Sequence, residues 1–211
     1  GDLAIAAAAA AQLAPLPLLA GSAGLAAHLP RAFRLSPGRA PASRLAPRPG
    51  LLLAVAGSGQ AHTRQQVGDL LARCPGAGVA VGAADDPGDV AGRLVAGSAA
   101  ARPVAILSLR PGDPEPDRAI QVMGAAARYL AEAGALAGVI ATGGTTAVAI
   151  LQALDATAVE ILEAVGGQVP LCLVLDGPCA GLPLVTKGGA LGEIEIFARA
   201  ARRLAIGARQ L

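Results

Sequence analysis

Short apolar runs that alternate with helical segments constrain the fold of this chain more than any other feature. Residues 51–56 are apolar at every position and residues 104–109 at all but one, as expected for strands buried on both faces of a sheet. Apolar residues recur at helical spacing between such runs, most clearly in 117–133. This alternation predicts an α/β fold in three layers, with helices on both faces of a mainly parallel sheet. In such sheets ligands bind at the carboxyl ends of the strands.

The same patterns predict the remaining elements. Further strands are expected at 16–20, 78–81, 138–141, 159–165, 171–175 and 182–185. Helices are expected at 3–13, 24–33, 86–95 and 117–133, from the turn at 143–146 to Leu154, and near the C-terminal end. Another helix should begin near Thr63, because Thr63 and Gln66 have the spacing of a capping box.

Composition limits the core and the partners. The 211 residues suffice for one well-packed core, or for one domain and part of another. With two Phe, one Tyr and no Trp, the core must consist of Ala, Val, Leu and Ile. A net charge of +2 and so few aromatic residues give no reason to expect nucleic acid as a partner. The three cysteines form no Cys-x-x-Cys pair, which argues against zinc and disulfides and fits a cytoplasmic protein.

The chain divides at a segment rich in proline and arginine. Residues 35–50 contain four prolines and no apolar periodicity, which predicts a linker. We expect the remnant of another domain at 1–34 and the main domain at 51–211. Residues 3–29 carry no charged side chain, but prolines and glycines interrupt them, so no membrane span is expected. The absence of an initiator Met suggests that the sequence begins inside a longer protein.

Three glycine-rich turns follow predicted strands, at 57–59, 143–146 and 187–192. Because the carboxyl ends of parallel strands meet at one edge, the turns should lie together and offer free N–H groups and hydroxyls to an anion. Lys187, the only lysine of the chain, lies in the third turn. Its compact ammonium suits a phosphate group. The turns match neither a P-loop nor a Rossmann motif, and glycines that simply make tight turns are the plainer interpretation of each one alone.

Three motifs, in this order, resemble the nucleotide-binding domain of the four-carbon acid sugar kinase family: residues 54–66, 138–147 and 182–192. Residues 18–25 are similar to the end of that family's N-terminal, sugar-binding domain. The resemblance implies a kinase that uses ATP and Mg²⁺ to phosphorylate threonate, erythronate or their 3-oxo forms at the terminal hydroxyl. It also implies that the sugar acid binds to an N-terminal domain whose aspartate-rich motif is absent from this chain.

The resemblance, together with the turns, gives a set of candidate site residues. Lys187 is expected to stabilise the phosphates, and no metal ligand is identified. The expected nucleotide-binding residues are Ser58, Gly143, Gly144, Thr145, Thr146, Gly188 and Gly189. The chain departs from the family at Thr145, where an acidic residue is usual, and at Gly188 and Leu191, where Ser and Phe are usual. Outside this set, His62 and Asp176 read more plainly as a surface histidine and a loop aspartate.

Two other functions stay open. A degenerate module could bind a nucleotide or a phosphorylated metabolite without catalysis, and Thr145 favours this reading. The chain could also be a structural or interaction domain that associates with a separate sugar-binding chain. A homo-oligomer is compatible with each of these functions.

The linker can be tested by limited proteolysis with trypsin. Cleavage should begin in 35–50, at an arginine such as Arg39 or Arg44, because this segment lacks a buried stripe. N-terminal sequencing should then find a resistant fragment that begins near Leu51. First cleavage inside 51–211 would show that the domain is drawn wrongly.

Overall fold

The computed structural model describes residues 2–12, 18–36, 45–46, 48–73, 78–98 and 104–204. The chain forms two compact units, Gly1–Ala42 and Ser43–Leu211. Leu45, in the segment expected to be a linker, is buried among the core residues of the second unit. None of the helices in the described residues is long and apolar enough to cross a membrane.

The first unit is helical, with α1 at Asp2–Ala10, α2 at Ala23–Ala26 and α3 at Leu29–Ala32. The prediction of one helix over 24–33 is wrong, because two short helices occupy that segment. Pro30 explains the break, since it has no N–H for the bond to the Ala26 carbonyl that a continuous helix needs. Of the strand expected at 16–20, residues 16 and 17 lie outside the described residues and 18–20 form no regular structure.

The second unit is built on a seven-stranded sheet in the order β2-β3-β1-β4-β7-β6-β5. Its strands are β1 Leu51–Ala56, β2 Gly78–Val81, β3 Val104–Leu109, β4 Leu136–Thr142, β5 Val159–Gly166, β6 Val169–Val174 and β7 Pro183–Lys187. Its helices are α4 Ala61–Arg73, α5 Pro87–Gly97, α6 Pro116–Glu132, α7 Gly144–Ala153 and α8 Ile196–Leu204. The strands and helices predicted in this unit are all present, with bounds that shift by a few residues.

Five adjacent strands, β2, β3, β1, β4 and β7, are parallel, which confirms the mainly parallel sheet. Only β6 runs the other way, antiparallel to β5 and to β7. Its direction follows from the connection, because two residues, Gly167 and Gln168, join β5 to β6. A connection this short permits a hairpin but no crossover.

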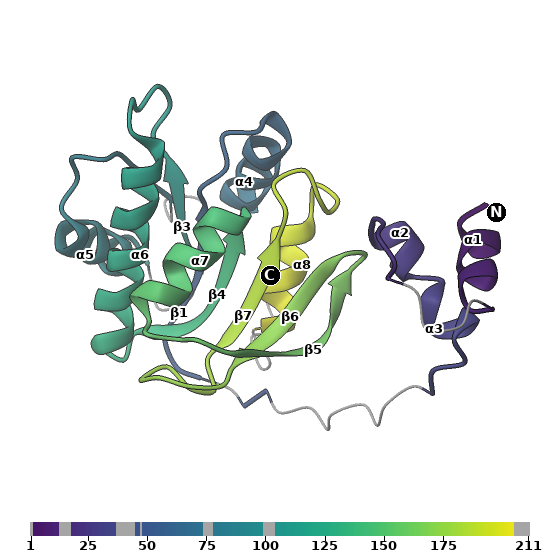
Figure 1. Ribbon diagram of the computed structural model, residues 1–211. Coiled ribbons are helices and arrows are strands. Elements are labelled where there is room, and N and C mark those ends of the chain that lie inside the picture. The colour runs from purple at the N-terminus through teal and green to yellow at the C-terminus, as the bar shows by residue number, and fades with distance from the viewer. Residues whose placement is uncertain are drawn as a thin grey trace. The chain divides into compact units, whose positions relative to one another are not determined.

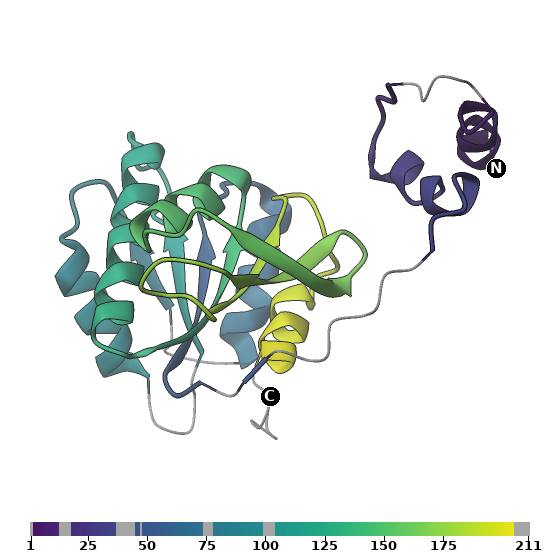
Figure 2. The same ribbon diagram turned by 60° about the horizontal axis from the view of Figure 1, so that its bottom comes forward.

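Helices cover both faces of the sheet, in the three layers that the sequence predicts (Figures 1 and 2). On one face α5, α6 and α7 pack Leu94, Met123 and Ile150 against residues such as Leu53. On the other face α4 and α8 bury a second set, listed here by its largest members: Leu70, Ile106, Leu171 and Phe197. Both cores are aliphatic, and Phe197 is the single aromatic side chain among their buried residues.

The connections after β1 and β4 leave the sheet on opposite faces. From β1 the chain passes through α4 toward β2, at one side of the sheet, and from β4 through α7 toward β5, at the other side. β1 and β4 are neighbours, so their carboxyl ends form a topological switch point. This is where open α/β sheets bind ligands.

Candidate functional site

The three glycine turns lie together at the carboxyl ends of β1, β4 and β7, which are adjacent strands. A Cβ on Gly57 would collide with Thr146 Oγ1, and one on Gly189 would lie 2.7 Å from Ser58 Oγ. The Gly143 N–H donates to the Lys187 carbonyl at 2.8 Å. The first turn thus touches the other two, and these two are joined to each other. Glycine is required at the contacts because a side chain would force the turns apart.

The second turn forms the N-terminus of α7. Gly143 has a φ of +102°, which glycine tolerates, and provides no side-chain cap. Gly144 and Thr145 are exposed, while Thr146 is buried against the first turn. The first N–H groups of a helix have no partner within the helix, so an uncapped and partly exposed N-terminus can bind an anion.

Lys187 is buried beneath the third turn rather than extended into solvent. Its side chain is 4% exposed, and Nζ donates to the Gly189 carbonyl at 3.3 Å. Nζ lies 5.8 Å from the centroid of the Phe197 ring. No carboxylate in the described part of the chain pairs with it, and burial lowers the pKa of Lys187 to about 8. Its charge is therefore available to an anion that reaches this end of the sheet.

The buried polar side chains of the described residues gather at this site. They are Thr63, Gln66, Thr142, Thr146 and Lys187. Thr142 lies beside Lys187 in the parallel register, and its hydroxyl has no hydrogen-bond partner among the described residues. Sequence reasoning missed Thr142, although its position at the end of a fully apolar strand could have indicated it. Burial of a polar group is costly, so five in one place make this end of the sheet the candidate site.

The capping box predicted at Thr63 and Gln66 is wrong. α4 begins at Ala61, so both residues lie inside the helix, and both bind the third turn. Thr63 Oγ1 donates to the Gly189 carbonyl at 2.9 Å. Gln66 Nε2 lies 2.9–3.1 Å from the carbonyl oxygens of Leu191, Gly192 and Glu193. A local motif could not predict these bonds, because their partners are more than 120 residues away.

These bonds fix the direction of the loop's peptide groups. In a trans peptide the N–H points opposite to the preceding carbonyl. Because α4 holds the carbonyl of Gly189, the N–H of Ala190 is turned away from α4. The same holds for Gly192 and Glu193, whose preceding carbonyls contact Gln66. Within the described residues, none of these three N–H groups has a hydrogen-bond acceptor, so they are free to donate to a ligand.

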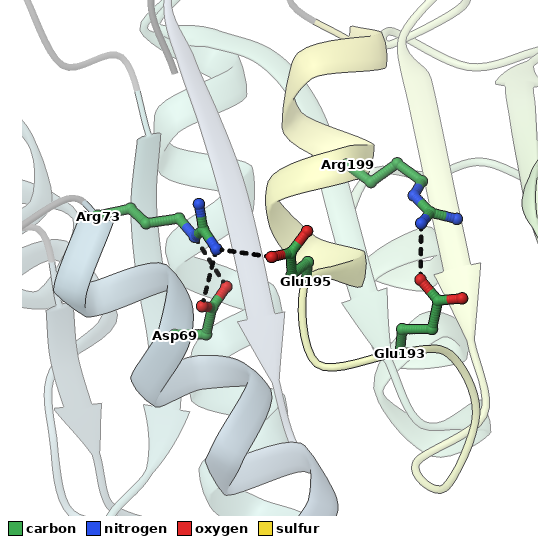
Figure 3. A network of polar contacts seen from close by, with 5 residues as sticks. All are labelled: Asp69, Arg73, Glu193, Glu195 and Arg199. Carbon is green, nitrogen blue, oxygen red and sulfur yellow. Dashed lines mark hydrogen bonds and ion pairs between the residues drawn. The ribbon is translucent and has the colours of Figure 1, made fainter.

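Charged side chains on the surface join α4 and α8 to the segment between β7 and α8 (Figure 3). Arg73 on α4 donates to Asp69 at 3.0 Å and to Glu195 at 3.2 Å. Arg199 on α8 pairs with Glu193 at 2.6 Å. All these side chains are partly exposed, so solvent screens each pair and its contribution to stability is small. His62 adds a ring nitrogen 2.8 Å from the Gly192 carbonyl oxygen, which gives this histidine a structural contact.

A pocket of about 590 Å³ adjoins the turns on the β3 side. Its walls come from α4, from the ends of β1, β2 and β3, and from the loop that follows β3. It includes Ser58 of the first turn, but neither Lys187 nor the turn at 143–146. Sequence reasoning did not identify this pocket, because three separate segments form it.

An ion-pair cluster holds the loop that follows β3, part of which lines the pocket. Arg110 donates to Asp85 at 2.7 Å, and Asp113 accepts from the Ala83 N–H at 3.0 Å. The Arg110 guanidinium, together with the Gly82 N–H, lowers the pKa of Asp85 and keeps the carboxylate ionised. In the described part of the chain, no group of three or more His, Cys, Asp and Glu side chains could hold a metal ion. Asp176 accepts from the N–H groups of Thr157 and Ala158, as a structural loop aspartate does.

Gln66→Leu tests the contact between α4 and the loop. The substitution should lower the free energy of unfolding by about 1–3 kcal/mol, because buried carbonyls lose their donor. Urea denaturation measures the effect. Gln65, the exposed neighbour, is the matched control, and Gln65→Leu should stay within about 0.5 kcal/mol of wild type. Equal effects of the two substitutions would show that Gln66 does not hold the loop.

Lys187→Met tests the cost of the buried charge. The pKa of Lys187 is lower in the folded chain than in the unfolded chain, where it is near 10.5. The unfolded chain therefore binds more protons between pH 8 and 10.5, so wild-type stability should rise with pH in this window. The methionine variant should be more stable at pH 7, by on the order of 1–3 kcal/mol, and the difference should shrink by pH 10. A difference that does not vary with pH would contradict this.

Parts of this chain are similar to known proteins. Residues 53–197 match the family described as the nucleotide-binding C-terminal domain. A D-threonate kinase from Bordetella bronchiseptica is 42% identical over 88 residues, which cover 42% of this chain and 22% of that protein.

Solved structures extend the likeness to the whole chain. A domain of unknown function from Bordetella bronchiseptica, a domain-swapped dimer with bound citrate, is 30% identical, with a TM-score of 0.67. The match covers 100% of this chain and 52% of that one. A Haemophilus influenzae protein has the same fold, at 20% identity and a TM-score of 0.63, over 96% of this chain and 51% of its own. This chain thus spans about half the length of these structures. It belongs to the family of nucleotide-binding C-terminal domains of four-carbon acid sugar kinases.

Proposed function

We propose that this chain is the ATP-binding part of a kinase that phosphorylates a four-carbon sugar acid at its terminal hydroxyl. The convergence of the three turns carries this proposal. They bring together the α7 N-terminus, the N–H groups of the third turn, three hydroxyls and the Lys187 ammonium. All of these are donors or positive charges, as a triphosphate requires.

The chain's own residues would act by binding and by stabilising charge. Mg²⁺-ATP would supply the phosphoryl group, which passes in line to the acceptor hydroxyl. The N–H groups of Gly144 and Thr145 and the hydroxyl of Ser58 would hold phosphate oxygens. Lys187 would neutralise charge that develops during transfer, and a bound phosphate would restore its full protonation. Mg²⁺ would enter the site together with the phosphates of ATP, whose charge it would neutralise.

The acceptor site and the assembly are proposed on the likeness to relatives. The D-threonate kinase supports threonate or a related sugar acid as substrate, held by an N-terminal domain. We propose that residues 1–34 are the remnant of that domain, 35–50 the linker and 51–211 the nucleotide-binding domain. The domain-swapped relative supports a homo-oligomer. The free, buried thiols of Cys172 and Cys179 fit a cytoplasmic protein.

A second function is favoured by one residue. Thr145 occupies an exposed position in the first turn of α7, where the family usually has a carboxylate. Without that carboxylate, the chain could bind a nucleotide and yet not transfer its phosphate. A product assay with a sugar acid acceptor on the full-length gene product separates the two functions, since only the kinase forms a phosphorylated sugar acid.

Calorimetry of Mg²⁺-ATP and AMP binding tests the proposal. Mg²⁺-ATP at 100 times its dissociation constant should raise the free energy of unfolding of the chain by about 2.7 kcal/mol. Lys187→Ala should weaken ATP binding by roughly ten- to hundredfold, because a charge-assisted hydrogen bond is worth about 1.5–3 kcal/mol. AMP binding should change less, since the lysine is expected to meet the outer phosphates.

Lys187→Arg is the matched control for charge. It should restore only part of the affinity, because a planar guanidinium on a longer stem fits poorly in a tight turn. Equal ATP affinity of wild type and Lys187→Ala would remove Lys187 from the site. Failure of Mg²⁺-ATP to bind the folded wild type would refute the nucleotide function itself.

A further inference from the structure

One register row crosses the five parallel strands at their carboxyl ends. The row consists of Ala80, Ser108, Ala56, Thr142 and Lys187, each paired with the next across neighbouring strands. Side chains along a strand point alternately to the two faces of the sheet. Val79 and Val81, the neighbours of Ala80, belong to the core under α5, α6 and α7, whereas Ala56 belongs to the core under α4 and α8. The row therefore faces the layer of α4 and α8. Adjacent strands are about 4.8 Å apart, so the row is roughly 19 Å long.

The size of the side chains, and the space above them, change along the row. Its first three members, Ala80, Ser108 and Ala56, have small side chains and line the 590 Å³ pocket. Its last member, Lys187, lies against Phe197 of α8, which fills the space at that end. Small side chains therefore leave room on the β3 side, whereas the β7 side is closed by packing. Along this row, a ligand longer than its phosphates has room to extend toward β3, where the pocket lies.

The pocket walls suit a nucleoside. Val67 and Pro111 offer apolar surface to the faces of a base, and the pocket volume lies in the range of small-molecule sites. Ser108, Arg64 and Arg110 also line the pocket, and their side chains carry hydrogen-bond donors that suit the polar edges of a nucleoside. Ser58, Gly59 and Thr63 line the same pocket, and Ser58 also touches the third turn. The pocket thus continues directly into the proposed phosphate site.

We propose that the nucleoside of the bound nucleotide lies in this pocket over Ala80, Ser108 and Ala56, and that its phosphates run along the row toward Lys187. The proposal rests on the proposed nucleotide function and adds the direction in which the nucleotide lies. The terminal phosphate is then at the β4–β7 end, next to the turn at 143–146 and the lysine. The transferred group leaves from that end, so the acceptor hydroxyl must approach there and not over β3.

Filling the pocket tests the direction. Ala80 is exposed at the end of β2, so Ala80→Leu adds bulk to the pocket without disturbing the core. Ser108→Leu adds bulk to the same pocket from β3 and serves as a second variant. Ala158, an exposed alanine just before β5 that does not line the pocket, gives the control Ala158→Leu. Melting temperatures show whether each variant is folded. Calorimetry then measures three probes on the full chain: Mg²⁺-ATP, AMP and Mg²⁺-tripolyphosphate, which lacks the nucleoside.

The expected result is a split between the probes. Both pocket variants should weaken ATP and AMP binding at least tenfold and leave tripolyphosphate binding within about twofold of wild type, and the control should change none of them. Unchanged ATP affinity in a folded pocket variant would overturn the proposal. Equal losses of affinity for ATP and for tripolyphosphate in a pocket variant would also overturn it, as would a comparable loss of ATP affinity in Ala158→Leu. A wild type that binds tripolyphosphate as tightly as ATP would overturn it too. If the wild type binds none of the probes, the nucleotide function fails, and this proposal fails with it.

Discussion

The parallel pairing of five strands is the constraint on which the rest of the structure depends. It places the carboxyl ends of β1, β4 and β7 side by side, so that three turns far apart in sequence become one surface. It also sets the register that brings Lys187 beside Thr142 and Thr142 beside Ala56. An antiparallel arrangement of the same strands would divide these residues between two edges. The site is therefore a property of the sheet and not of any one loop.

The site is maintained against a cost in stability. Burial lowers the pKa of Lys187, and the hydroxyl of Thr142 lacks a partner among the described residues. Such groups destabilise a folded chain unless a ligand satisfies them. Gln66 opposes this cost by binding the carbonyls of the third turn, so the loop is held in place before any ligand arrives. A preorganised loop loses less conformational entropy on binding, which favours affinity.

Lys187 illustrates how the structure changes the meaning of a residue. As a lone lysine in a glycine turn, it suggests an ammonium that reaches into solvent toward a phosphate. The structure instead places its Nζ under the loop, near Phe197 and the Gly189 carbonyl. From there the charge acts at short range and in a poorly solvated setting, where electrostatic interactions are stronger than in water. Its role as a phosphate ligand remains a proposal that the buried position supports.

The sequence by itself determined the fold class and the place of the turns. Fully apolar runs such as 51–56 form strands that are covered on both faces of a sheet. The helical spacing of apolar residues in 117–133 predicts a helix that can cover one of these faces. Resemblance of the motifs to the sugar acid kinases identified the family correctly. Local patterns failed where long-range contacts decided the outcome. Thr63 and Gln66 had the spacing of a cap, yet their side chains bind a loop more than 120 residues away.

Only the tertiary structure decided the strand order, the reversal of β6 and the pocket. Strand order depends on packing between elements that no local pattern reports, and it makes β1 the neighbour of both β3 and β4. The pocket arises because Ala80, Ser108 and Ala56 come from three strands and share one register row. Each is an unremarkable small residue in sequence. Their joint effect exists only when the sheet is assembled, because empty space is a property of neighbours and not of a single residue.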